Sequence, residues 1–162
     1  MNPLSANLRS LSREELLKHI QSSRPTPYQL ISQEREEVYL YCAFDALLYP
    51  LLTGKRWTVE ARPPGGDPLR LELAPEGPKE DGLWISFIGP EAPLPEAPGM
   101  PSSRCPYLHF FASIEDLLAW RATLPPEIRT LVQALPLSEA FQLAQAALEG
   151  LLKEGESAAG CC

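Results

Sequence analysis

The chain has 162 residues, of which 44% are hydrophobic and 22% charged, and its formal net charge at pH 7 is -7. This length suits one domain with a sizeable core, and the negative charge argues against nonspecific nucleic-acid binding, which depends on Lys and Arg. No run reaches the roughly 18–20 apolar residues that cross a bilayer, and no signal pattern opens the chain, so we expect a cytoplasmic protein with reduced thiols and no membrane partner.

The first predicted element is a helix that follows Ser12. Ser12 and Glu15 form a capping-box pattern, and apolar residues continue to Ile20. A proline pair then disfavours helix and indicates a linker. The sequence therefore predicts a short helical segment and linker over residues 1–35, followed by a core over residues 36–153.

An apolar segment begins at Val38 and contains the second predicted helix. We expect its start to be extended and a helix to run from about Cys42 to Leu52. Asp45 lies three positions after Cys42, which places both side chains on one helix face. Gly54 is expected to end the helix.

Three strands are predicted next. Residues 56–61 and 69–73 alternate with period two around turn-forming residues 63–67, which indicates a hairpin, and residues 84–88 form a third strand. Residues 90–101, rich in Pro, Ala and Glu, are expected to form a loop. The 18 prolines and scarce asparagines fit a thermophilic source, and a GC-rich genome would give the same composition.

The last third of the chain alternates short strands with helices. Residues 107–111 and 130–135 are strand-like, Ser113 caps a helix, and Ser138 is expected to cap a long amphipathic helix over residues 139–153. The sum is an α+β fold, with a mostly antiparallel sheet and surrounding helices.

Cys42 and Asp45 are the first candidates for chemistry, because they interrupt an otherwise apolar run. A helix that begins near Cys42 would lower the pKa of its thiol through the amide dipole, and Asp45 could exchange a proton with it. Alternatively, Cys42 is a small buried hydrophobe and Asp45 bonds a nearby amide. Spacing alone leaves both interpretations open.

Cys105 is the second candidate thiol. It precedes Pro106, so its backbone is extended or in a turn. His109 could join Cys105 in a metal site, but zinc needs further ligands and the other histidine, His19, lies far away in sequence. We expect His109 to be a satisfied core residue or a residue that supports the site.

Cys161 and Cys162 end the sequence within a tail, residues 154–162, that we expect to be flexible. Adjacent cysteines do not easily form a low-strain disulfide. They are either a pair of soft thiolates that bind a metal or a tail without function.

Two segments carry a resemblance to a known family. Residues 41–50 read Tyr-Cys-Ala-Phe-Asp-Ala-Leu-Leu-Tyr-Pro, and residues 105–113 read Cys-Pro-Tyr-Leu-His-Phe-Phe-Ala-Ser. They resemble the two signature segments of the organomercurial (alkylmercury) lyases, and residues 137–141 resemble the entrance to that family's final helix. The resemblance covers residues 38–152, which is most of the chain.

This resemblance implies that Cys42 and Cys105 bind mercury and that Asp45 is their acidic partner. Mercury prefers thiolate to oxygen or nitrogen ligands, and two thiolates on one mercury weaken its bond to carbon. Asp45 would relay a proton, so that the organic group leaves as a hydrocarbon. The implied partners are an organomercurial substrate and, as acceptors of the bound Hg(II) product, low-molecular-weight thiols or a mercuric reductase, and no organic cofactor is needed.

The sequence departs from the family in two places. About 37 residues precede the first signature, where members usually carry a larger N-terminal winged-helix-like region, so we expect a more open site. Pro106 stands where members can carry another cysteine. In addition, Cys161 and Cys162 resemble the vicinal pair that ends mercuric reductases, which implies that the tail binds Hg(II) and collects it from the site.

Two other functions stay open at this stage. The chain could be a carrier of the same fold that binds Hg, Cu or Zn through thiolates without catalysis. It could also be a redox sensor in which Cys42 and Cys105 form a reversible disulfide. Asp45 separates the first from a lyase, because a thiolate carrier gains nothing from a carboxylate in an apolar wall.

Overall fold

The computed structural model describes residues 12–98 and 102–151 of the chain. The predicted tail, with Cys161 and Cys162, lies outside these residues. The helices are α2 (Arg13–Ile20), α3 (Ala43–Thr53), α4 (Ile114–Arg121), α5 (Pro126–Arg129) and α6 (Leu137–Leu151), and a 3₁₀ turn spans Cys105–Tyr107. The strands are β1 (Gln21–Ser22), β2 (Tyr28–Ser32), β3 (Glu37–Leu40), β4 (Trp57–Ala61), β5 (Leu69–Ala74), β6 (Gly77–Pro78), β7 (Trp84–Phe87), β8 (Phe110–Phe111) and β9 (Gln133–Pro136).

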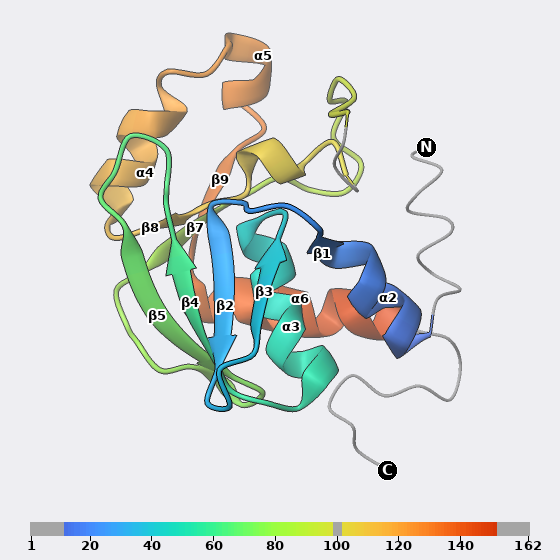
Figure 1. Ribbon diagram of the computed structural model, residues 1–162. Coiled ribbons are helices and arrows are strands. Elements are labelled where there is room, and N and C mark those ends of the chain that lie inside the picture. The colour runs from blue at the N-terminus through green and yellow to red at the C-terminus, as the bar shows by residue number, and fades with distance from the viewer. Residues whose placement is uncertain (1–11, 99–101, 152–162) are drawn as a thin grey trace.

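The strands form two antiparallel sheets, which confirms the α+β class. The larger sheet has the order β1-β3-β2-β4-β5-β6, and the smaller has the order β8-β7-β9. Figure 1 shows α3 and α6 behind the larger sheet, and α3 contacts β2, β3 and β5 as well as α6. The sequence led us to expect one sheet, but β7 pairs with β8 and β9 rather than with the hairpin. No helix in the described part of the chain has the length and apolar character to span a membrane.

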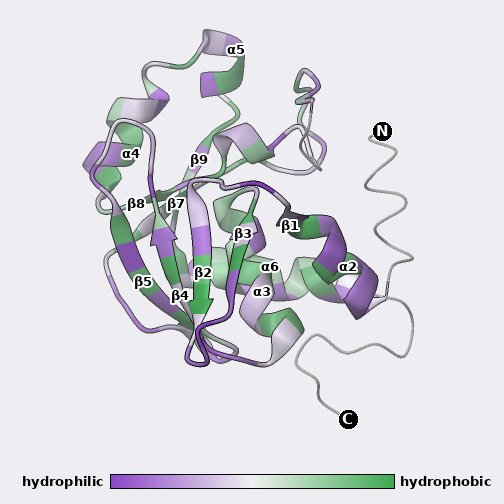
Figure 2. Ribbon diagram, in the orientation of Figure 1, coloured by the Kyte–Doolittle hydropathy of each residue, from purple (hydrophilic) through white to green (hydrophobic). Residues whose placement is uncertain are grey.

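Strand β2 is the largest difference from the predicted elements. The division predicted at residue 35 leaves residues 28–32 in a linker, yet they pair with β3 on one side and with β4 on the other. Tyr28, Leu30 and Ser32 are buried and alternate with half-buried residues. Hydropathy does not follow this alternation, because β2 changes from hydrophilic to hydrophobic along its length (Figure 2). The segment before residue 36 therefore supplies a central strand of the sheet, and prolines before the strand and charged residues after it hide this signal.

Helix α3 is confirmed, and it is the helix that positions the site. Residues 43–52 are all buried, as expected for a helix that is apolar on every side and packs in a core. Cys42 is its N-cap residue, with extended backbone. Gly54 ends it in the left-handed conformation (φ 69°), and its amide donates to the Pro50 carbonyl at 2.8 Å.

The remaining predicted elements need small corrections. The capping box at Ser12 and the cap at Ser113 are confirmed, and the hairpin of β4 and β5 forms as expected. However, α6 begins at Leu137, so Ser138 lies inside the helix instead of capping it. Strand β8 has only two residues because Cys105–Tyr107 forms the 3₁₀ turn.

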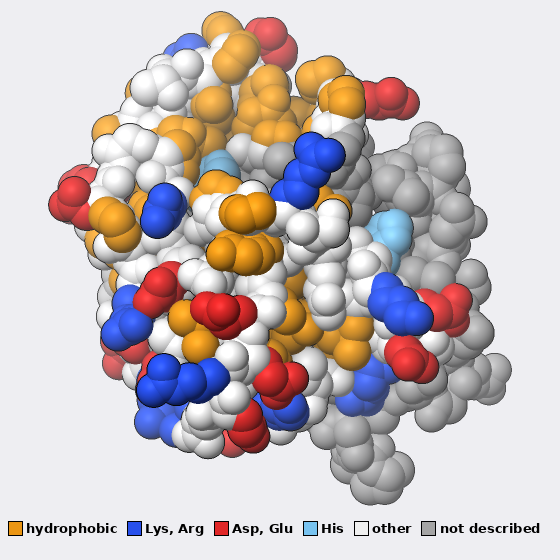
Figure 3. Space-filling view, viewed as in Figure 1, with side chains coloured by type: hydrophobic (Ala, Val, Ile, Leu, Met, Phe, Trp, Pro, Cys, Tyr) orange, Lys and Arg blue, Asp and Glu red, His pale blue; other side chains and the backbone are white. Residues whose placement is uncertain are grey.

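The face of the molecule in Figure 3 mixes charges of both signs. Acidic and basic side chains intermingle over its lower part, and hydrophobic side chains gather toward the top. Among the residues that the structure describes, three ion pairs join strands or their flanks, namely Lys55–Glu36, Arg70–Glu60 and Lys79–Glu72. All six side chains are exposed, so these pairs contribute little to stability.

Candidate active site

Cys42, Asp45 and Cys105 converge at one buried point. One ligand atom from each residue lies within 4.8 Å of the other two. The exposed fractions are 1% for Cys42, 7% for Asp45 and 3% for Cys105, and both cysteines are free thiols. The structure thus brings together the three residues that the sequence analysis placed in one site, and we call them the trio.

The start of α3 supplies the first two members of the trio. Cys42 is the N-cap residue and Asp45 is the third residue of the helix, so both side chains lie on the same face at its first turn. The Ala46 amide donates to the Cys42 carbonyl at 3.3 Å, which continues the helical pattern back to the cysteine. The carboxylate is therefore held beside the thiol by the helix itself.

The 3₁₀ turn supplies Cys105 and is fastened directly to α3. The Cys105 amide donates to the Ser102 carbonyl at 3.2 Å, and the Leu108 amide donates to the Cys105 carbonyl at 3.4 Å. The Ala43 amide, next to Cys42, donates to the Leu108 carbonyl at 3.0 Å. This backbone contact joins two segments that are distant in sequence and sets the two thiols face to face.

Asp45 is poised to hold or release a proton near neutral pH. Burial raises its pKa from 3.8 to about 7, while hydrogen bonding to Cys42, the charge of Arg104 and the nearby backbone amides of Tyr41 and Cys42 lower it. Its Oδ2 atom is buried and has no hydrogen-bond partner among the described residues. A buried carboxyl oxygen without a partner is costly in a core, and it leaves one oxygen free to face a ligand.

Cys42 is a neutral thiol in the resting protein. Burial raises its pKa well above the ordinary value, and the contact with Cys105 and the negative charge of Asp45 raise it further. The expectation that the helix dipole lowers this pKa is therefore wrong, because desolvation of the thiolate outweighs the dipole. A soft metal that displaces the proton would restore the thiolate form.

Arg104 is a cation beside the trio that sequence reasoning missed. Its Nη1 donates to the Ile88 carbonyl at 2.9 Å, and its Cζ lies 6.0 Å from the centroid of the Phe87 ring, which in turn packs on Phe44. Its charge interacts with Cys42, Cys105 and Asp45, whereas burial lowers its own pKa. The one available signal was its position next to Cys105.

His109 is a partly buried, hydrogen-bonded residue that lies outside the trio. Its Nδ1 contacts the hydroxyl of Tyr28, and its Nε2 lies 2.8 Å from the Pro106 carbonyl. Burial lowers the pKa of His109 to about 4, so its ring is neutral. This confirms the expectation of a satisfied core residue. Its partner Tyr28 was missed because β2 was missed.

A surface hollow of about 570 Å³ lies away from the trio, between the β4–β5 turn and α4. Its lining includes Asp67, Phe111 and Trp120, and none of the three trio residues. It has no cluster of groups suited to chemistry, so the buried trio is the better candidate site.

The chemistry of the trio follows from its donors. Two thiols and one carboxyl in an apolar enclosure suit a soft metal that is held by two sulfur atoms. The carboxyl adds a proton that can be delivered within the same enclosure. This combination fits a metal–carbon bond as the substrate better than it fits a closed structural site, which would use four ligands.

Comparisons with known proteins agree with this interpretation. A family model described as alkylmercury lyase (MerB) matches residues 21–149. The alkylmercury lyase of Pseudomonas putida is 32% identical over 139 residues, which cover 82% of this chain and 60% of that protein. The alkylmercury lyase of Staphylococcus epidermidis is 25% identical over 142 residues, which cover 85% of this chain and 61% of that protein.

A solved structure shares the fold. It is described as the mercury-bound form of MerB2, and it matches with a TM-score of 0.60 at 18% identity over 82% of this chain and 62% of that one. The chain thus spans about three fifths of the length of the relatives it matches.

Proposed function

The chain belongs to the alkylmercury lyase family, and from this premise we propose that it cleaves carbon–mercury bonds by protonolysis, giving a hydrocarbon and Hg(II). The observation that carries the proposal is the trio, in which Cys42, Asp45 and Cys105 meet within 4.8 Å inside the core. Two thiols would bind the metal and the carboxyl would deliver the proton, so the groups present match those that the reaction requires.

The first step is capture of the substrate by one thiol. An organomercurial arrives as an adduct of a small thiol, and a cysteine of the trio exchanges with that thiol. A sulfur–mercury bond forms, the sulfur–mercury bond to the small thiol breaks, and the small thiol leaves with the cysteine's proton. The second cysteine then binds the same mercury, and its proton passes to the Asp45 carboxylate.

The second step is transfer of that proton to carbon. With two thiolates on the metal, electron density rises at the attached carbon, and the protonated Asp45 delivers its proton there. The mercury–carbon bond breaks, its electron pair takes the proton, and the hydrocarbon leaves while Hg(II) stays on both sulfur atoms. A pKa of about 7 suits this double role, because the group accepts and returns a proton at neutral pH.

Release of Hg(II) requires other thiols, because two sulfur bonds hold it. Low-molecular-weight thiols or a mercuric reductase would act as acceptors, and the cycle uses no organic cofactor. Cys161 and Cys162, which lie outside the described residues, would collect Hg(II) from the trio. Changing both to Ser should then slow metal release without slowing hydrocarbon release, and unchanged transfer kinetics would remove this role.

The test is detection of the hydrocarbon. Reduced protein is incubated with phenylmercury and excess thiol, and benzene is measured by gas chromatography. Cys42→Ser, Cys105→Ser and Asp45→Ala serve as the matched variants. Benzene from the parent alone supports the lyase and the three roles, whereas tight mercury binding without benzene would reassign the protein as a soft-metal carrier.

A further inference from the structure

A chain of hydrogen bonds runs from strand β2 to the turn that carries Cys105. The Tyr28 hydroxyl contacts Nδ1 of His109, and Nε2 of the same ring lies 2.8 Å from the Pro106 carbonyl. Tyr28 is 1% exposed. A tyrosine and a histidine placed here for packing alone would bring polar atoms into the core at a cost in free energy. Their polar contacts therefore indicate a role besides packing.

The Pro106 carbonyl, which ends this series of hydrogen bonds, determines where the protons of His109 and Tyr28 lie. A carbonyl oxygen only accepts, so Nε2 of His109 must carry the proton and donate it to Pro106. The neutral ring then accepts at Nδ1, and the Tyr28 hydroxyl donates to it. The pKa shifts agree, because burial lowers that of His109 to about 4 and raises that of Tyr28. Each of the two residues therefore fixes the orientation of the next.

The 3₁₀ turn depends on such outside support. A 3₁₀ turn has poorer hydrogen-bond geometry than an α-helix, and Pro106 offers no amide. Three successive carbonyls are instead held by other segments. Pro106 accepts from the His109 ring, Tyr107 accepts from the Ser86 hydroxyl at 2.7 Å, and Leu108 accepts from the Ala43 amide at 3.0 Å.

The Pro106 contact is the one nearest to Cys105. The Leu108 contact ties the far end of the turn to α3 next to Cys42. The Ser86 side chain also accepts from the His109 amide at 2.9 Å, which fixes the backbone after the turn. Loss of the His109 contact would leave the Pro106 carbonyl, directly after Cys105, without its side-chain donor.

We propose that Tyr28 and His109 are positioning residues that act through the Pro106 carbonyl to hold Cys105 at the separation from Cys42 needed for both thiols to bind one mercury. This rests on the proposed function. On this proposal, Tyr28 and His109 affect formation of the second thiol–mercury bond. The first capture needs one thiol and does not depend on the pair.

A double-mutant cycle tests whether Tyr28 acts through His109. Tyr28→Phe, His109→Leu and the double variant are compared by the single-turnover rate of benzene release. We expect about a 10-fold loss in Tyr28→Phe and about a 100-fold loss in His109→Leu, because small misplacements of reacting groups have effects of this size. The double variant should match His109→Leu. Losses that multiply would overturn the proposal, since Tyr28 would then act independently.

Two further variants separate positioning from stability. His109→Gln keeps a donor for Pro106 and should retain more activity than His109→Leu. Tyr49→Phe removes another largely buried tyrosine hydroxyl, which accepts from Gln21 at 2.8 Å at the other end of α3. It should leave benzene release unchanged, so a loss as large as that of Tyr28→Phe would mean a general effect of core disruption.

A binding measurement keeps this proposal distinct from the proposed function. Inorganic Hg(II) uses both sulfur atoms, whereas phenylmercury is captured by one. Both variants and their parent are therefore compared in a Cys161→Ser/Cys162→Ser background, in which Cys42 and Cys105 are the remaining thiols. In competition with a small thiol, Tyr28→Phe and His109→Leu should bind Hg(II) more weakly than this parent, about 10-fold or more, and capture phenylmercury equally. Equal Hg(II) binding by folded variants would overturn the positioning role, even if the parent released no benzene.

Discussion

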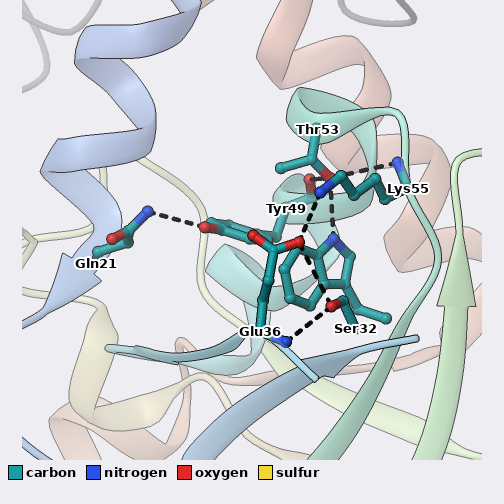
Figure 4. A network of polar contacts seen from close by, with 7 residues as sticks. Gln21, Ser32, Glu36, Tyr49, Thr53 and Lys55 are labelled. Atoms are coloured by element: carbon teal, nitrogen blue, oxygen red, sulfur yellow. Dashed lines mark hydrogen bonds and ion pairs between the residues drawn. The ribbon is translucent and has the colours of Figure 1, made fainter. Parts of the chain in front are cut away.

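The two ends of helix α3 differ in whether their polar side chains have hydrogen-bond partners. At the C-terminal end, Tyr49 accepts from Gln21 at 2.8 Å, and Thr53 donates to the Tyr49 carbonyl at 2.9 Å and accepts from the Trp57 indole at 2.9 Å. Figure 4 shows these contacts joined by the Lys55–Glu36 ion pair and by Ser32. These side chains have the partners that they require.

At the N-terminal end, the same helix leaves one buried carboxyl oxygen without a partner among the described residues. This oxygen is Oδ2 of Asp45, and burial keeps both Asp45 and Cys42 from ionising at their ordinary pKa. A core that was selected only for stability would resemble the C-terminal end throughout. This difference supports the proposed site at the N-terminal end, and each of the following changes tests it.

Removal of a thiol should produce the largest effect. Cys42→Ser or Cys105→Ser should lower benzene release by about 1,000-fold or more, because a hydroxyl does not bind mercury as a thiolate does. Thr53→Val at the other end of α3 should leave benzene release unchanged. Equal losses in the thiol and Thr53 variants would mean that the two ends do not differ in function.

Asp45→Asn should separate activity from stability. We expect benzene release to fall by about 100- to 10,000-fold, the usual range for loss of a general acid. The raised pKa of Asp45 favours folding below pH 3.8, and this contribution is lost as the pH rises to about 7. Above pH 7 the variant should therefore be the more stable protein, by about 1–4 kcal/mol. Urea denaturation at pH 8 measures this, and a destabilised variant would contradict the burial cost.

The contribution of His109 to folding stability should depend on pH in the direction opposite to that of Asp45. Its pKa falls from 6.5 to about 4 on folding, so its contribution is present above pH 6.5 and is lost as the pH drops toward 4. Urea denaturation at pH 7 and pH 4.5 should show an acid loss of about 1–3 kcal/mol in the parent that is smaller in His109→Gln. An equal acid loss in both proteins would mean that His109 titrates normally.

Arg104→Gln should have a moderate effect on the pH profile. The charge of Arg104 lowers the pKa of Asp45, so its removal raises that pKa and moves the alkaline fall in activity to higher pH. The rate at pH 7 should change by less than about 10-fold. Arg104→Lys keeps the charge and should restore the parent profile. The same pH profile in the parent and in Arg104→Gln would contradict the electrostatic role.

Lys55→Ala should have the smallest effect. Lys55 and Glu36 form a 2.7 Å ion pair, but both side chains are about half exposed, and solvent screens such pairs. Neither the thermal unfolding midpoint nor benzene release should change measurably. A clear loss of activity would connect the C-terminal end of α3 to the reaction.

Much of the site was within reach of the sequence. The helix start at Cys42 and the three-residue spacing to Asp45 place those two residues together by local geometry. Cys105 was assigned by resemblance, because no local rule brings a residue from a distant turn to α3. The contact that does so is the backbone hydrogen bond from Ala43 to Leu108, which carries no signal in side-chain identity.

Tyr28 and Arg104 could not be predicted from the sequence for a related reason. Tyr28 reaches His109 only because β2 pairs with β4 in the middle of the sheet, and pairing between strands so far apart depends on the whole fold. Arg104 is an ordinary loop residue until Phe87 and the Ile88 carbonyl hold its guanidinium beside the trio. The direction of the Cys42 pKa shift likewise depends on burial, which periodicity does not measure.

The most direct test of the trio as a lyase site is the mass of the mercury adduct after one turnover. A Cys161→Ser/Cys162→Ser variant, in which the trio holds the remaining thiols, is mixed with one equivalent of phenylmercury and analysed by native mass spectrometry. We predict an adduct that contains one mercury atom and no phenyl group. An adduct that keeps its phenyl group would show capture without cleavage and would contradict the account.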